Sequence, residues 1–125
     1  MAEIVLDASA ILALLRNEPG SEAVRAVIAT GLVSTVNVSE VVAKLVERGA
    51  SEAIDIVDSL PFETADFDTG LALAAGLMWT RGKKVGLSLG DRACLALAEH
   101  RRLPVITADR QWRGLDVSIE VRILR

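Results

Sequence analysis

Short runs of apolar and β-branched residues alternate along the chain with longer stretches of helical periodicity. The runs predict strands at residues 4–6, 32–35, 60–63, 104–107 and 119–124, and the first and fourth have the apolar character of strands buried on both faces. Helices are predicted at residues 8–15, 21–30, 37–48, 51–59, 66–81 and 90–100, several of them ended by a Gly. Strands separated by helices require crossover connections, so we expect a three-layer α/β/α fold with a mainly parallel central sheet.

Length and composition favour a single domain over residues 1–125. Of the 125 residues, 51% are hydrophobic and 25% are charged, which excludes a disordered or fibrous chain. No apolar stretch approaches the roughly 18 residues that span a bilayer, and the first residues do not resemble a signal peptide. Cys94 is the only cysteine and lies in an apolar helix, so we expect a core residue, no disulfide and a cytoplasmic protein without a membrane segment.

Charge and aromatic content limit how the protein would bind nucleic acid. The formal net charge is −3, and aromatic residues make up 3% of the chain. Net charge would therefore not hold the protein on a phosphate backbone, and no aromatic platform for stacking bases is evident. A nucleic-acid substrate would need another source of positive potential.

Four acidic residues are predicted to meet at one edge of the sheet. Asp7 directly follows the first strand, and Asp109 lies two residues beyond the end of the fourth. Sites in open α/β sheets form outside the carboxyl ends of the strands, so both aspartates are expected there. Glu40 and Asp91 lie in the first turns of helices that are expected to begin at the same edge.

Each acid also has a simpler interpretation as a helix cap. Asn37-x-x-Glu40 and Ser88-x-x-Asp91 resemble capping boxes, and the two aspartates that follow strands can cap the helix or turn that comes next. A cap contributes about 1 kcal/mol, which is reason enough for an acid at each of these positions taken singly.

Taken together, the four acids indicate a divalent cation. Carboxylates crowded at one edge repel by on the order of 4 kcal/mol for a close pair at an effective dielectric constant near 20. A set of oxygen ligands without histidine or cysteine favours Mg²⁺ or Mn²⁺ over Zn²⁺, and His100 is expected to be a solvated cation at a helix end. Carboxylate-held Mg²⁺ serves mainly phosphoryl chemistry, because it acidifies water and stabilises the leaving oxygen.

Four segments of the chain carry these acids in a distinctive order. They are Asp7-Ala-Ser9-Ala, the helix that contains Glu40, Leu89-Gly-Asp91-Arg-Ala-Cys-Leu-Ala, and Val105-Ile-Thr107-Ala-Asp109-Arg-Gln-Trp112. Together they resemble the PIN-domain ribonucleases, and more narrowly the VapC toxins of bacterial and archaeal toxin–antitoxin pairs. The resemblance extends over essentially the whole chain and shows no departure at the four acidic positions.

The resemblance implies a metal-dependent endoribonuclease. In that family the four acids hold one or two Mg²⁺ or Mn²⁺ ions, the last acid often through water; here they are Asp7, Glu40, Asp91 and Asp109. Ser9 and Thr107 match hydroxyl positions that support the acids. The cation, rather than the net charge, then presents positive potential to the RNA phosphate. Arg92, Arg110 and residues 81–84 are candidates for contacts with flanking phosphates, and an ordinary solvated surface is the alternative.

The resemblance also implies a homodimer and a cognate VapB-like antitoxin whose C-terminal segment lies across the toxin and blocks its site. Residues 21–30 and 38–47 are rich in Ala and Val and are candidates for the groove that receives it.

Two alternatives stay open: a PIN fold retained as a non-catalytic scaffold or RNA-binding module, and another Mg²⁺-dependent phosphoryl-transfer enzyme on a similar sheet. Four intact acids argue against the scaffold, and Asp7-Ala-Ser9 lacks the second Asp of a phosphatase nucleophile motif.

Overall fold

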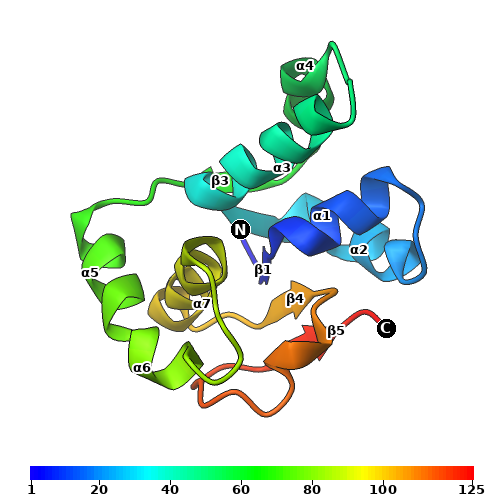
Figure 1. The fold of residues 1–125 in the computed structure, drawn as a ribbon. Coiled ribbons are helices and arrows are strands. Elements are labelled where there is room, and N and C mark those ends of the chain that lie inside the picture. Colours follow the sequence, from blue (N-terminus) through cyan, green and yellow to red (C-terminus); the bar gives the residue numbers. More distant parts are fainter.

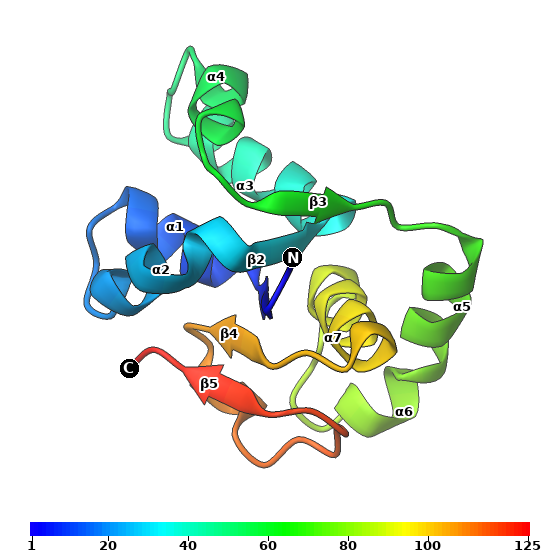
Figure 2. The ribbon, with the colours of Figure 1, turned by 180° about the vertical axis from the view of Figure 1, so that it is seen from behind.

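Five short parallel strands form the centre of the molecule. The computed structural model describes all residues from Met1 to Arg125. The strands are β1 (Ile4–Leu6), β2 (Gly31–Ser34), β3 (Glu63–Ala65), β4 (Val105–Thr107) and β5 (Val121–Ile123). Their order in the sheet is β3-β2-β1-β4-β5 and every pairing is parallel, with β3 and β5 at the two edges (Figure 2). The predicted parallel sheet is confirmed.

Helices cover both faces of this sheet (Figure 1). One layer contains α1 (Ala8–Leu15), α2 (Ser21–Val27), the 3₁₀ helix η1 (Ile28–Thr30), α3 (Thr35–Glu47) and α4 (Ala53–Asp58). The other contains α5 (Thr69–Leu77), α6 (Trp79–Gly82) and α7 (Leu89–Arg101), and the 3₁₀ helix η2 (Arg110–Trp112) follows β4. The three-layer α/β/α arrangement is therefore as predicted. None of the helices is long and apolar enough to cross a membrane.

The central strands are apolar at every position because each face of the sheet has its own core. Ile4 and Leu6 of β1 pack into the cluster under α1 to α4, whereas Val5 between them packs into the cluster under α5 to α7. All three side chains are buried. Cys94 lies in the second cluster as a free, buried thiol, which agrees with its expected place in the core.

The third strand lies three residues later than its apolar pattern predicts. The expected segment was 60–63, but β3 is Glu63–Ala65, which pairs with β2 through Leu32↔Glu63 and Ser34↔Ala65. Leu60 and Phe62 are apolar because they pack against the core next to α1 to α4, not because they lie in a strand. Most of β3 is exposed at the sheet edge, so its residues carry little hydrophobic signal.

The long helix predicted over residues 66–81 is divided into two. The Asp68 side chain accepts a hydrogen bond from the backbone N–H of Leu71, so α5 begins after this cap, at Thr69. The chain then turns at Met78, which is buried, before α6 begins. Arg92 of α7 donates from Nη1 to the carbonyl oxygen of Ala75, which gives a carbonyl near the end of α5 a partner.

Candidate active site

The end of β1, the end of β4 and the first turns of α3 and α7 come together at one edge of the sheet. Thr107, the last residue of β4, donates from its hydroxyl to Asp7, which follows β1. Asn37 of α3 bonds to the backbone of Gly90 in α7. These contacts join parts of the chain that are far apart in sequence, at the strand ends where a site was expected.

Asp7 is the most deeply buried of the four acids, with only 4% of its surface exposed. Its Oδ2 accepts hydrogen bonds from Ser9 Oγ at 2.6 Å and from Thr107 Oγ1 at 2.9 Å. Asp7 occupies the N-cap position of α1, but its side chain makes no capping hydrogen bond. The interpretation of this acid as a helix cap is therefore wrong.

The two hydroxyls are oriented toward Asp7 by the backbone of the loop after β4. The N–H of Ala108 donates to Ser9 Oγ at 2.9 Å, and the N–H of Asp109 donates to Thr107 Oγ1 at 3.0 Å. Because each hydroxyl oxygen accepts a backbone hydrogen bond, its own hydrogen is free to point at the carboxylate. Ser9 and Thr107 thus lie where residues that support Asp7 were expected.

Burial raises the pKa of Asp7 from its ordinary value of 3.8 to about 6. The hydrogen bonds from Ser9 and Thr107 lower this pKa, whereas the negative charges of Asp91 and Glu40 raise it. Three carboxylates from different parts of the chain are therefore in electrostatic contact. A bound cation would stabilise the ionised form of all three.

Glu40 is held by the buried amide of Asn37 rather than by a helix cap. Asn37 Nδ2 donates to Glu40 Oε1 at 2.7 Å. The N-cap of α3 is Ser34, whose hydroxyl accepts from the N–H of Val36, so Asn37 lies inside the helix. The expected capping box of Asn37 and Glu40 is therefore wrong, and the Asn37 side chain is free to fix the glutamate.

Asp91 both caps its helix and belongs to the group of acids near Asp7. The N–H of Ser88 donates to Asp91 Oδ2 at 2.9 Å, and the N–H of Asp91 donates to Ser88 Oγ at 3.1 Å, so the predicted capping box at the start of α7 is confirmed. The same carboxylate is near enough to Asp7 to raise its pKa. Capping thus sets the direction of the Asp91 side chain without removing it from the acidic group.

Asp109 is connected to this group only indirectly. Its Oδ1 accepts from the N–H of Gln111 at 2.9 Å and caps η2, as the capping interpretation predicted. Its backbone N–H bonds to the hydroxyl of Thr107, while the carboxylates whose charge acts on Asp7 are those of Asp91 and Glu40. The structure therefore gathers three of the four predicted acids and places the fourth beside them as a cap.

Comparison with known proteins identifies the family. The sequence matches the model of the PIN domain over residues 4–117. The chain belongs to the PIN-domain family. The resemblance inferred from the four acidic segments is thereby confirmed. No curated protein matches the sequence.

Solved structures with the same fold include toxins of toxin–antitoxin complexes. The DNA-bound VapBC of Salmonella typhimurium is 19% identical with a TM-score of 0.77, and the match covers 100% of both chains. VapC20 of Mycobacterium tuberculosis, named as a toxin that cleaves the sarcin-ricin loop, is 16% identical with a TM-score of 0.73 over 90% of this chain and 96% of that one. FitAcB of Neisseria gonorrhoeae is 19% identical with a TM-score of 0.71 over 95% and 96%. At these identities the likeness is one of fold.

PIN domains are generally metal-dependent, and the donor set of this one is suitable for a hard cation. Asp7, Glu40 and Asp91 each have one oxygen engaged by a protein donor, and the other oxygen accepts no hydrogen bond from the protein. Free carboxylate oxygens are the ligands that Mg²⁺ and Mn²⁺ prefer. In their present rotamers no three acidic, histidine or cysteine side chains of the chain surround a common metal position. The chemistry of the donor atoms in this PIN domain therefore fits the ion.

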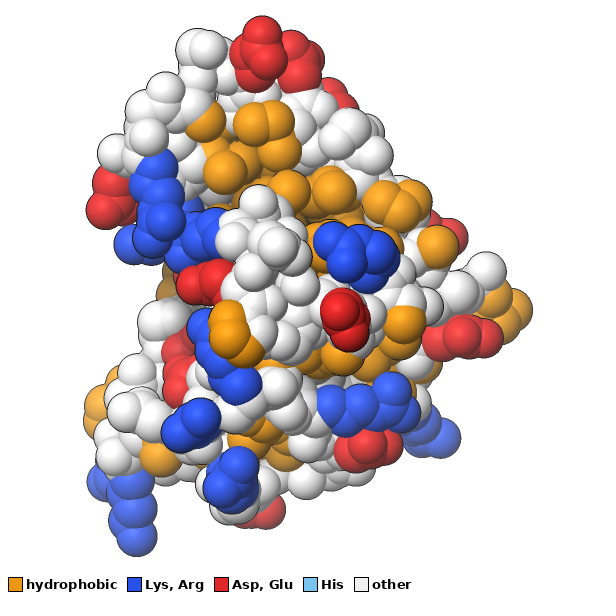
Figure 3. All heavy atoms as spheres, turned by 90° about the vertical axis from the view of Figure 1, so that its right-hand side faces the viewer, with side chains coloured by type: hydrophobic (Ala, Val, Ile, Leu, Met, Phe, Trp, Pro, Cys, Tyr) orange, Lys and Arg blue, Asp and Glu red, His pale blue; other side chains and the backbone are white.

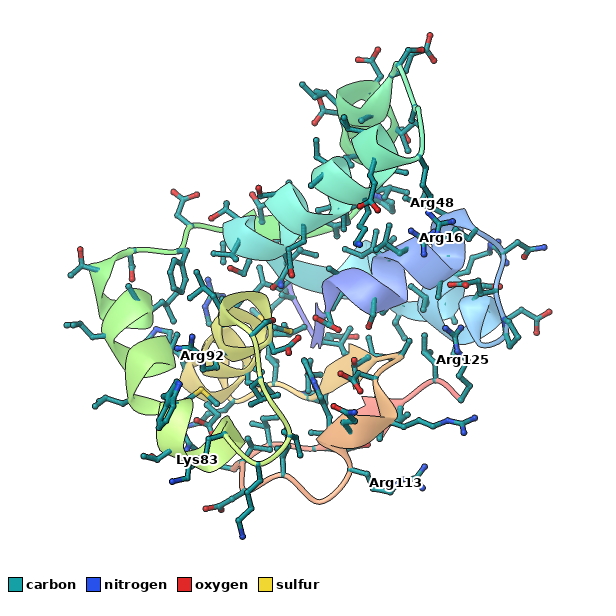
Figure 4. All side chains as sticks on the ribbon, viewed as in Figure 1. Arg16, Arg48, Lys83, Arg92, Arg113 and Arg125 are labelled. Carbon is teal, nitrogen blue, oxygen red and sulfur yellow. The ribbon has the colours of Figure 1, made fainter.

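Three of the basic residues expected to contact RNA donate hydrogen bonds within this PIN domain. Figure 4 shows Arg92 between α7 and α5, where its Nη1 bonds to the carbonyl of Ala75 at 3.2 Å. Arg110 is exposed, and its Nε donates to the carbonyl oxygen of Arg125 at 2.7 Å. Arg81 pairs with Glu99 through both terminal nitrogens. Lys and Arg side chains on the face in Figure 3 are scattered rather than gathered.

Two residues of this arrangement were not identified from the sequence. The sequence predicts Asn37 as a helix cap and gives Gly90 no role at the site, although a Cβ at Gly90 would overlap the carboxylate of Glu40. A small residue directly before Asp91 and an amide one turn before Glu40 are the only local signals of this contact. Neither signal is specific until α3 and α7 are known to lie together.

Proposed function

We propose that this PIN domain is a metal-dependent endoribonuclease and the toxin of a VapBC-like toxin–antitoxin pair. The observation that supports this most is the burial of Asp7 close to Glu40 and Asp91: burial raises the pKa of Asp7, and the charges of Asp91 and Glu40 raise it further. Carboxylates that repel one another destabilise a fold unless a cation balances them. PIN domains are typically nucleases, and carboxylates are the ligand type that a metal-dependent nuclease uses.

In the proposed mechanism, Asp7, Glu40 and Asp91 would hold Mg²⁺ or Mn²⁺, with Asp109 as the fourth acid of the site. When bound, the cation supplies the positive charge and the acidified water that hydrolysis of a phosphodiester requires. Ser9 and Thr107 keep the Asp7 carboxylate in one orientation through their two hydrogen bonds. Because the pKa of Asp7 is about 6, this ligand is mostly ionised at pH 7 and above.

The proposed partners are a cognate antitoxin similar to VapB and a second copy of the chain. Figure 3 shows a band of apolar side chains across the upper part of the face that carries α1, α2 and α4. Leu15 of α1 and Val42 and Leu45 of α3 are partly buried, and Val46 of α3 is exposed; these side chains suit an apolar antitoxin segment. Leu73 and Leu77 are exposed on α5 and offer a separate apolar face for a homodimer.

Substitution of the central acids tests the nuclease. Asp7→Asn and Asp91→Asn should each abolish cleavage of an RNA substrate, because each removes a charged ligand while preserving side-chain size. The matched control is Asp55→Asn, an exposed aspartate of α4 outside the site, which should cleave as the wild type does. Chelation with EDTA should stop cleavage, and Mn²⁺ should restore it.

Two results would contradict the proposal. Cleavage that survives complete chelation would exclude the metal-dependent reaction. Wild-type cleavage by both Asp7→Asn and Asp91→Asn would mean that the gathered carboxylates are not the active site. Proteins that bind RNA without cleaving it in any of these assays would instead support a non-catalytic PIN module.

A further inference from the structure

Asn37 is a polar side chain buried at the junction of α3 and α7. It has 0% exposed surface and lies one turn before Glu40. Its Nδ2 donates to Glu40 Oε1 at 2.7 Å and to the carbonyl oxygen of Gly90 at 3.0 Å. These two acceptors use both hydrogens of the amide and fix its orientation. One side chain thus ties the Glu40 carboxylate to the backbone immediately before Asp91.

The amide of Asn37 is only partly satisfied within the fold. Its Oδ1 is buried and has no hydrogen-bond partner, and a buried acceptor without a donor destabilises the folded state. Asn37 is also not needed to start α3, because Ser34 caps that helix. An apolar side chain at this position would avoid the unpaired oxygen. The feature that an apolar residue could not supply is the pair of hydrogen bonds that Asn37 donates to Glu40 and Gly90 at the candidate site.

Gly90 completes the restraint on Glu40 from the other side. It is buried in the first turn of α7, and a Cβ there would overlap all three atoms of the Glu40 carboxyl group. The carboxylate therefore rests against the Cα of Gly90 while Asn37 holds Oε1. Oε2 accepts no hydrogen bond from the protein and is left for a cation.

We infer that Asn37 is a positioning residue for the cation site: it fixes the Glu40 carboxylate and its placement relative to Asp91. The inference rests on the metal-dependent activity proposed above. Residues that orient metal ligands typically change metal affinity or activity by about 10–100-fold when they are removed. Asn37 acts through Glu40 and does not itself contact the substrate.

The test measures Mn²⁺ binding and stability separately in the full chain. Asn37→Ala and Asn37→Leu are titrated with MnCl₂ in a calorimeter without RNA, and their thermal unfolding is measured without metal. We expect the Kd for Mn²⁺ to rise about 10–100-fold in both variants. The metal-free Tm of Asn37→Leu should stay close to that of the wild type, because removal of the unpaired acceptor offsets the loss of the two hydrogen bonds. The control is Ser21→Ala, which removes a buried hydroxyl that bonds only to the Asn17 side chain and should keep wild-type affinity.

The outcomes separate this inference from the proposed function. If the wild type binds Mn²⁺ and cleaves RNA, and Asn37→Ala and Asn37→Leu bind Mn²⁺ with wild-type affinity, Asn37 only packs α3 against α7 and the inference is wrong. A lowered Tm with unchanged Mn²⁺ affinity leads to the same conclusion. If the wild type itself binds no Mn²⁺ and Asp7→Asn still cleaves RNA, the proposed function fails and the inference fails with it.

Discussion

The charge of Asp7 should destabilise the folded protein at neutral pH. Burial raises the pKa of this acid from 3.8 to about 6, so the folded state binds the proton more tightly than the unfolded state. The contribution of Asp7 to stability is therefore most favourable below about pH 4 and is lost as the pH rises through 6. A difference of about two pKa units corresponds to about 3 kcal/mol of unfolding free energy. The buried negative charge of Asp7 thus lowers the unfolding free energy of the wild type at neutral pH.

Asp7→Asn removes the titration with little change in side-chain size. The amide oxygen can accept the same two hydrogen bonds from Ser9 and Thr107. At pH 8 the variant should gain up to about 3 kcal/mol relative to the wild type, or about 10 °C in Tm for a domain of this size. The new amide hydrogens need acceptors that the carboxylate did not, and this offsets part of the gain by an amount independent of pH.

The decisive quantity is therefore how the difference between variant and wild type changes with pH. Urea unfolding in EDTA at pH 4, 5, 6, 7 and 8 measures it, with the exposed Asp55→Asn as control. We expect the difference in unfolding free energy to grow by about 2.5 kcal/mol from pH 4 to pH 8, because the unfolded state is already partly ionised at pH 4. Parallel curves for Asp7→Asn and wild type would show that Asp7 has an ordinary pKa, and the argument from burial and repulsion would be refuted.

Two further substitutions act on the same site. Thr107→Val removes a hydroxyl that lowers the pKa of Asp7, so the acidic limb of the pH profile for RNA cleavage should move to higher pH; an unmoved limb would mean that Asp7 does not control it. Gly90→Ala favours the helix by up to about 1 kcal/mol but places a Cβ on the Glu40 carboxylate, so Tm should hold or rise while cleavage falls at least about 10-fold. A lower Tm with full activity would contradict this.

The sequence predicted the sheet because its central strands are buried on both faces. Ile4, Val5 and Leu6 pack into two different cores, so every position of β1 is apolar and the run is recognisable locally. The helical stretches between such runs then require parallel connections. Asp7 and Asp109 were placed near the strand ends for the same reason.

The edge strand β3 and the break between α5 and α6 could not be predicted from the hydrophobic pattern. The exposed residues of β3 join the sheet through backbone pairing with β2, which leaves no mark in the hydrophobic pattern. The break at Met78 likewise has no local sign, because Ala, Leu and Gly continue the helical pattern up to it. Both features depend on which neighbours the backbone meets.

What the sequence determined about the site is the set of acids and the strand and helix ends that carry them. Only the tertiary structure decided what each acid does. Asp109 caps η2, Asp91 caps α7 and also faces Asp7, and Asp7 caps nothing. Local sequence permits all of these outcomes, because a capping rotamer and an inward rotamer can both be reached from the same backbone.

The choice is made by hydrogen bonds between distant residues. Thr107 is 100 positions from Asp7, and Gly90 is 53 positions from Asn37, yet these contacts orient the Asp7 and Glu40 carboxylates. Such partners meet only after the strands have paired and the helices have packed. The direction of a buried charge is set by where its donors lie in space, and no stretch of the chain contains that information by itself.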